Sequence, residues 1–252
     1  MSKLKNAVPP LILLSILVAA WWWIVVATKS LILPTPWAVV SGTFELAKDG
    51  SLWTHIGYSL MRVGVGFLLA LSLAIPLGLC MGRVQAVHIT LNPLVQLLRP
   101  ISPIAWIPLA ILWFGVGDAS PIFLIFIASL FPVMVQTAAG VQTIEQRYLR
   151  AANNFAVPRY KLYRQVIIPA VLPDLVVGMR ISLGIAWLVV VAAEMITPHS
   201  GLGFLIMDAR NAGNRYDLVI GAMIMIGIIG LLLDVLMRLL EKLESVRWRY
   251  GQ

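Results

Sequence analysis

The sequence predicts an all-α membrane protein with six transmembrane helices. Of its 252 residues, 60% are hydrophobic and only 12% are charged, and the mean hydropathy is +0.91. A soluble domain carries about 25% charged residues, so this chain has too little polar surface to cover a water-soluble globule. Its apolar segments are longer than the strands of a membrane barrel need, which favours helices. We expect a single transmembrane domain over residues 1–252.

The six expected spans are the apolar runs that lie between polar or proline-rich breaks. The first run follows a charged, signal-like start without a cleavage site, and the cluster Trp21-Trp22-Trp23 is typical of a membrane interface. Short interfacial helices are expected at residues 37–48 and 204–211. The expected spans are residues 8–27, 60–81, 93–114, 121–141, 174–196 and 218–240.

The distribution of Lys and Arg predicts how the chain is oriented. An even number of spans puts both termini on one side. Most basic residues fall on that side, namely Lys3, Lys5, Arg83, Arg147, Arg150, Arg159, Lys161, Arg164, Arg238, Lys242, Arg247 and Arg249. Only Lys29, Lys48, Arg210 and Arg215 fall on the other. The positive-inside rule therefore predicts cytoplasmic termini, and it explains the net charge of +8 without nucleic acid as a partner.

A polar, basic segment at residues 148–173 separates the fourth and fifth spans. Val157-Pro158 is expected to form a turn, with Pro158 as the first residue of a second helix. Pro169 and Pro173 are expected to end that helix before the chain re-enters the membrane. We interpret the segment, within a loop of about residues 142–173, as a docking element for a partner protein. The alternative is a basic loop that only binds anionic lipid headgroups, at about 1 kcal/mol per charge.

The order of residues in this segment resembles the cytoplasmic "EAA" loop of permease subunits of bacterial ABC importers. That loop reads Glu-Ala-Ala, three residues, Gly, nine residues, Ile, one residue, Leu-Pro. Here Arg150-Ala151-Ala152 occupies the triplet and Ala156 the Gly position. Val166 occupies the Ile position and Ile168-Pro169 the Leu-Pro position. Arg replaces Glu and Ala replaces Gly.

Other stretches resemble the subfamily of these permeases for nitrate, sulfonate, taurine or bicarbonate. Together they extend the resemblance over nearly the whole chain. They are residues 33–36 (LPTP), 99–108 (RPISPIAWIP), 113–117 (WFGVG), 192–196 (AAEMI) and 201–204 (GLGF).

The resemblance implies the partners and the location of the chain. It implies a second copy of the chain, two cytoplasmic subunits that bind ATP-Mg, and a periplasmic or lipid-anchored substrate-binding protein, all at the bacterial inner membrane. The loop would be a coupling helix that sits in a groove of the ATPase. The implied coupling residues are Arg147, Arg150, Ala151, Ala152, Asn153, Asn154, Phe155, Ala156, Pro158, Arg159 and Tyr160. The chain itself would hold no cofactor and no catalytic site.

Charged residues inside the spans predict a translocation pathway. Arg180, Trp187 and Glu194 are seven residues apart and share one helix face. A small-residue stripe at residues 178, 182, 186 and 193 lies opposite and would allow close helix packing. Arg99 and Trp106 lie in the proline-broken third span, where irregular backbone requires protein or a wet cavity beside it.

Two arginines without a carboxylate deep in the same half of the membrane suggest a path for an anion. The alternatives are that Arg99 and Arg180 extend to the membrane surface, and that Glu194 forms a structural salt bridge with Arg62, Arg210 or Arg215.

Three further functions stay open at this point. The substrate could be neutral or cationic, the chain could be a channel or transporter without an ATPase, or, more distantly, it could be a membrane enzyme. The sequence contains no G-x-x-x-x-G-K-[ST] phosphate-binding loop, and its three histidines have no metal-binding spacing. The loop at residues 201–214 is expected to act as a gate or as a surface for the delivery protein, and the alternative is an ordinary interfacial helix.

Overall fold

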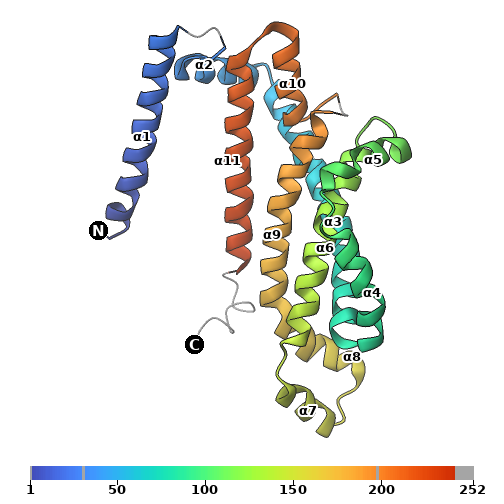
Figure 1. The fold of residues 1–252 in the computed structure, drawn as a ribbon. Coiled ribbons are helices and arrows are strands. Elements are labelled where there is room, and N and C mark those ends of the chain that lie inside the picture. The colour runs from blue at the N-terminus through green and yellow to red at the C-terminus, as the bar shows by residue number, and fades with distance from the viewer. Residues whose placement is uncertain (1, 30–31, 197–198, 242–252) are drawn as a thin grey trace.

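A computed structural model describes residues 2–29, 32–196 and 199–241, and the regular structure in these ranges is entirely helical (Figure 1). Four helices are long and apolar enough to cross a membrane: α3 (Ser51–Arg83), α6 (Ala119–Gln142), α11 (Tyr216–Glu241), and α9 (Ile168–Glu194) with the turns before it. The pair made by α4 (Gln85–Leu98) and α5 (Ile107–Phe114) is bent by 87° and counts as a fifth if it forms one broken span.

The number of spans in the described residues is therefore four or five, against the six expected. In the first helix, α1 (Ser2–Thr28), the continuous apolar stretch whose side chains are described is Ile12–Thr28, which is shorter than the four spanning helices. Residues 85–92, expected as a connector, are helical and belong to α4. The short 3-10 helix η1 (Pro103–Trp106) separates α4 from α5, because the prolines there remove backbone donors.

Helix α3 begins well before the apolar run that predicted it. Its first two turns carry polar residues. These residues lie outside the apolar run that hydropathy identifies, but they are compatible with a helix. Asp49 fixes this start, because its carboxylate accepts hydrogen bonds from the Ser51 amide at 2.8 Å and the Ser51 hydroxyl at 2.7 Å. These two hydrogen bonds lower the pKa of Asp49.

Helices α3, α6 and α9 form the centre of the bundle through small residues. Gly78 of α3 faces Thr137 of α6 so closely that a side chain there would collide with it. Gly178 of α9 faces Gln136, and the Ser182 hydroxyl donates to the Ser129 carbonyl at 3.1 Å. The small-residue stripe of the fifth span therefore packs against α6, as expected for close helix contact.

Two short helices lie at one end of the bundle (Figure 1). The first, α2 (Pro36–Lys48), begins at the cap residue Thr35, whose hydroxyl accepts a hydrogen bond from the Ala38 amide at 3.2 Å. The second, α10 (Leu202–Gly213), precedes α11. Both confirm the short helices expected at 37–48 and 204–211, within a few residues.

At the opposite end, α7 (Gln146–Asn154) and α8 (Arg159–Leu162) project from the bundle (Figure 1). The expectation that Pro169 and Pro173 end the second helix is wrong, since helix runs unbroken from Arg159 to Glu194. A π-helical turn, η2 (Tyr163–Ile167), precedes Pro169 and takes up the altered hydrogen bonding. Pro158 also stands one residue earlier than expected, as the extended cap of α8.

Candidate coupling surface and pathway residues

The projecting end of the molecule carries exposed basic and aromatic side chains. We define the coupling surface as those predicted coupling residues of α7, the turn and α8 that are exposed: Arg147, Arg150, Ala151, Asn154, Phe155, Ala156, Pro158, Arg159 and Tyr160. Phe155 is the most exposed large hydrophobic residue of the described chain, at 83%. An aromatic residue this exposed, among arginines, is typical of an interface anchor.

Ala152 does not belong to this surface. It is 8% exposed and packs in a cluster with Val141, Leu162, Ile167 and Val171 at the base of α6 and α9. Of the alanine pair in the triplet, only Ala151 is available to a partner. Ala152 instead fixes α7 to the helix that re-enters the membrane. For Asn153, only the backbone in α7 is described.

Ala156 occupies a backbone conformation that favours glycine. Its φ is +47°, in the left-handed region. The Val157 amide donates to the Ala152 carbonyl at 3.0 Å and the Phe155 amide to the Ala151 carbonyl at 3.1 Å. This pattern ends α7 as a Schellman-type motif, in which the left-handed residue is usually glycine. The geometry accounts for the Gly of the loop pattern, and the alanine in this chain adopts it at a cost of about 1–2 kcal/mol.

Ala156→Gly is therefore expected to stabilise the protein. The relief of left-handed strain exceeds the extra entropy that glycine loses on folding, which leaves a gain of about 0.5–1 kcal/mol. Thermal unfolding of the purified protein measures it. Asn214→Gly is the matched control, because Asn214 has a φ of +52° but asparagine tolerates this region. An equal gain at both positions, or none at 156, would contradict this account.

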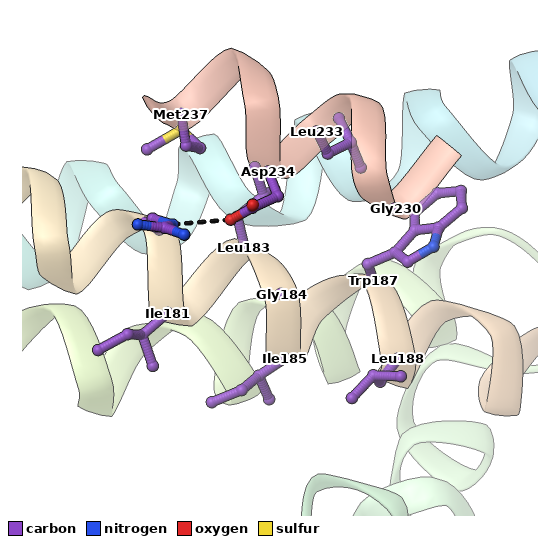
Figure 2. A pocket seen from close by; sticks show the side chains of 11 residues that line it. Ile181, Leu183, Gly184, Ile185, Trp187, Leu188, Gly230, Leu233, Asp234 and Met237 are labelled. Atoms are coloured by element: carbon purple, nitrogen blue, oxygen red, sulfur yellow. Dashed lines mark hydrogen bonds and ion pairs between the residues drawn. The ribbon is translucent and has the colours of Figure 1, made fainter. Parts of the chain in front are cut away.

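Two predicted pathway residues, Arg180 and Trp187, line a cavity of about 370 Å³ between α9 and α11. Figure 2 shows Trp187 toward one end of this cavity and Met237 toward the other. The Trp187 indole donates to the Ile226 carbonyl at 3.0 Å. The ring lies against Gly230, where a side chain would crowd it.

Arg180 has two carboxylate partners on α11. Its Nε donates to Asp234 Oδ1 at 2.7 Å, and its Nη1 lies 3.3 Å from Glu241 Oε1. The interpretation that no carboxylate lies in this part of the membrane is therefore wrong. The sequence does contain evidence for this ion pair, because Asp234 lies inside the apolar sixth span, where a charge needs a partner.

Glu194 lies away from this cavity, in a buried ion cluster near α10. Its Oε1 accepts from Arg62 Nη1 at 2.6 Å, and its two oxygens accept from the Ser59 hydroxyl at 2.9 and 2.8 Å. The side chains of Arg62 and Glu194 are 1% and 0% exposed. This ion pair is the structural salt bridge with Arg62 that was expected as an alternative to a pathway role for Glu194.

Each guanidinium nitrogen of Arg62 has an oxygen partner. Besides Glu194, Arg62 contacts Asp118 at 2.8 Å from Nε and 2.6 Å from Nη2. It donates to the Ser200 carbonyl and hydroxyl, both at 2.7 Å. We call Arg62, Ser59, Asp118, Glu194 and Ser200 the Arg62 cluster. Sequence reasoning gave Arg62 only as one alternative partner of Glu194 and missed Ser59, Asp118 and Ser200, although an arginine inside an apolar helix requires such partners.

Glycines let the chain close over this cluster. Gly201 has a φ of +108°, and a side chain there would collide with the Glu194 carboxylate. Gly203 leaves room for Val191, and its amide donates to Glu194 Oε2 at 3.1 Å. The GLGF sequence at 201–204 therefore serves the packing of this segment on Glu194.

Arg99 and Trp106 lie on either side of the break between α4 and α5. Arg99 is exposed and has no carboxylate within ion-pair distance in the described ranges. The Trp106 ring is half-buried, and its indole nitrogen is buried without an acceptor among the described residues. A buried donor without a partner is rare and calls for an explanation.

Residues 74–246 match the family described as "binding-protein-dependent transport system inner membrane component". The taurine transport system permease protein of Escherichia coli is 36% identical over 86% of this chain and 82% of its own length. The nitrate import permease protein of Leptolyngbya laminosa is 36% identical over 81% of this chain and 74% of its own length.

A solved structure has a similar fold. It is an inward-facing conformation of the MetNI methionine ABC transporter, with a TM-score of 0.65 and 17% identity, over 75% of this chain and 95% of the matched chain. The family match covers the coupling surface, the Arg62 cluster apart from Ser59 and Arg62, and the cavity. The chain belongs to the family of inner-membrane components of binding-protein-dependent transport systems, the ABC transporter permeases.

Proposed function

We propose that this chain is the transmembrane subunit of an ATP-driven importer and that two copies form a pathway for a small anion. ATP binding closes two cytoplasmic ATPase subunits, the coupling surface transmits the closure, and the pathway changes from inward- to outward-facing. A binding protein delivers the substrate. The observation that carries the proposal is the exposed Phe155, surrounded by arginines, on a segment inside the family match.

In this proposal the bent pair and α1 complete six spans across a bacterial cytoplasmic membrane. Both termini and the coupling surface lie in the cytoplasm, and α2 and α10 lie outside. The basic residues near α7 support this orientation. So do the described ends of α1 and α11, which both point toward the α7 end in Figure 1. The chain performs no catalysis itself, and ATP-Mg binds to the partner subunits.

The proposed substrates are nitrate, bicarbonate, taurine or an alkanesulfonate. The names of the relatives support this class. Two features of the broken span support it too: Arg99 is a cation without a carboxylate partner in the described residues, and Trp106 has a donor without an acceptor there. Anions accept hydrogen bonds from both kinds of group.

A neutral small molecule is the second candidate, because Asp234 and Glu241 already neutralise Arg180 beside the cavity. Uptake by vesicles that hold this chain with its ATPase and binding protein separates the candidates. Uptake of one of the four anions that requires ATP supports the proposal. Uptake without ATP indicates a channel. ATP-dependent uptake of neutral solutes, with no uptake of the four anions, favours the second candidate.

Trp106→Phe is expected to raise the anion concentration for half-maximal uptake about 10-fold or more. The variant keeps the aromatic ring but removes the indole donor, and a hydrogen bond to a charged group contributes about 1.5–3 kcal/mol. Trp113→Phe, at an exposed position of α5, is the matched control and should leave the value unchanged. An unchanged half-saturating concentration in the Trp106 variant would exclude a role for this donor.

A further inference from the structure

The Arg62 cluster joins segments that are far apart in the sequence. Ser59 and Arg62 lie on α3, Asp118 directly precedes α6, and Glu194 is the last residue of α9. Ser200 lies in the segment that leads into α10. Three spanning helices and one connecting segment therefore meet at one guanidinium group.

Side chains of the spanning helices also hold the backbone of the connecting segment. The Leu202 amide donates to the Ser59 hydroxyl at 2.9 Å, and the Gly201 amide donates to His55 Nδ1 at 3.1 Å. With the bonds from Arg62 to Ser200 and from Gly203 to Glu194, four consecutive residues are bound to α3 or α9. This segment cannot move away from the helices while the cluster is intact.

The charges make the cluster open as one unit. Arg62 and Glu194 are buried, so moving Arg62 away alone would leave Glu194 as an unpaired buried charge, which is strongly unfavourable, and moving Glu194 away would leave Arg62 with only the half-exposed Asp118. Asp118 is the accessible member, with a side chain that is 48% exposed. Opening the cluster therefore requires its buried members to separate and become hydrated together.

We propose that Arg62 is the positioning residue of the outer gate: it holds α3, α6, α9 and the Ser200–Gly203 segment together, so the pathway stays closed on the α10 side until all of them separate. This inference rests on the alternating-access function proposed above. A weakened cluster favours the outward-facing state, which is the state with closed ATPase subunits. The complex then hydrolyses ATP without being triggered by the binding protein.

The test is the ATPase rate of the assembled complex in lipid vesicles without binding protein. Ser200→Ala removes one acceptor of Arg62 and keeps every charge. We expect the rate to rise about 10-fold or more, the factor that corresponds to one hydrogen bond to a charged group. The number of anions imported per ATP should fall. Ser200→Thr keeps the hydroxyl and should behave as the wild type.

Ser120→Ala is the matched control. Ser120 is also buried near this end and donates to the Ala110 and Gly115 carbonyls at 3.1 and 2.5 Å, but it does not contact Arg62. Its variant loses buried hydrogen bonds to neutral carbonyls and should keep the wild-type rate. Asp118→Asn, which weakens the cluster from its exposed side, should raise the rate as Ser200→Ala does.

Two results would overturn the inference. One is a wild-type rate in both Ser200→Ala and Asp118→Asn, even if their thermal stability is lower. The other is an equal rise in Ser120→Ala, which would indicate general loosening. In either case ATP-dependent uptake by the wild type leaves the proposed function intact. If the wild type shows no such uptake, the proposed function itself fails.

Discussion

Glu194→Ala is expected to lower the free energy of unfolding by about 3–5 kcal/mol, the largest stability change among these predictions. The substitution leaves Arg62, which is 1% exposed, without its buried counter-charge. It also removes the acceptor of the Ser59 hydroxyl and the Gly203 amide. Thermal unfolding in detergent micelles, followed by tryptophan fluorescence, measures the loss.

Glu45→Ala is the control for this prediction. Glu45 also pairs with an arginine, Arg215, at 3.2 Å, but its side chain is 66% exposed, and exposed ion pairs contribute at most about 1 kcal/mol. The difference in the free energy of unfolding between the two variants therefore measures the effect of burying the ion pair. Similar shifts in unfolding temperature would show that the Arg62–Glu194 pair is not the buried contact described above.

Phe155→Ala is expected to weaken binding of the ATPase subunit by about 30-fold or more. A central aromatic anchor at an interface contributes about 2 kcal/mol or more, and each 1.4 kcal/mol is a factor of about 10 in affinity. Titration of the purified ATPase subunit onto the reconstituted permease measures the dissociation constant. ATP-dependent uptake should fall in parallel.

Phe44→Ala is the matched control for the docking surface. Phe44 is equally apolar and 68% exposed, but it lies on α2, at the other end of the bundle (Figure 1). Its variant should bind the ATPase subunit as the wild type does. If the Phe155 variant also binds normally, the partner does not use the tip of α7. Ala151→Glu is a second probe of the same surface, since Ala151 is exposed whereas Ala152 is buried.

The apolar runs predicted the helices better than their ends. Hydropathy finds the centre of a span, but α3 and α4 each begin with polar residues that lower a hydropathy average and are nevertheless helical. Proline was overvalued as a stop signal. At Pro169 a π-helical turn accommodates the missing donor, so the helix continues.

For the site, the sequence predicted which residues matter more reliably than what they contact. Arg180, Trp187 and Glu194 share a spacing of seven, yet two face α11 and the third pairs with α3. Periodicity gives the face of one helix but not the helix that covers it. Asp234 and Arg62 carried a local signal, a charge in an apolar run, and their partners depend on tertiary packing.

The unbroken helix from Arg159 to Glu194 has a mechanical consequence. Its 36 residues span about 54 Å at 1.5 Å per residue. One end carries part of the coupling surface and the other end supplies the buried carboxylate of the Arg62 cluster. The π-helical turn Tyr163–Ile167 lies between these two ends, within a continuous helix. One helix therefore connects the coupling surface with the Arg62 cluster, and its small residues pack on α6 along the way.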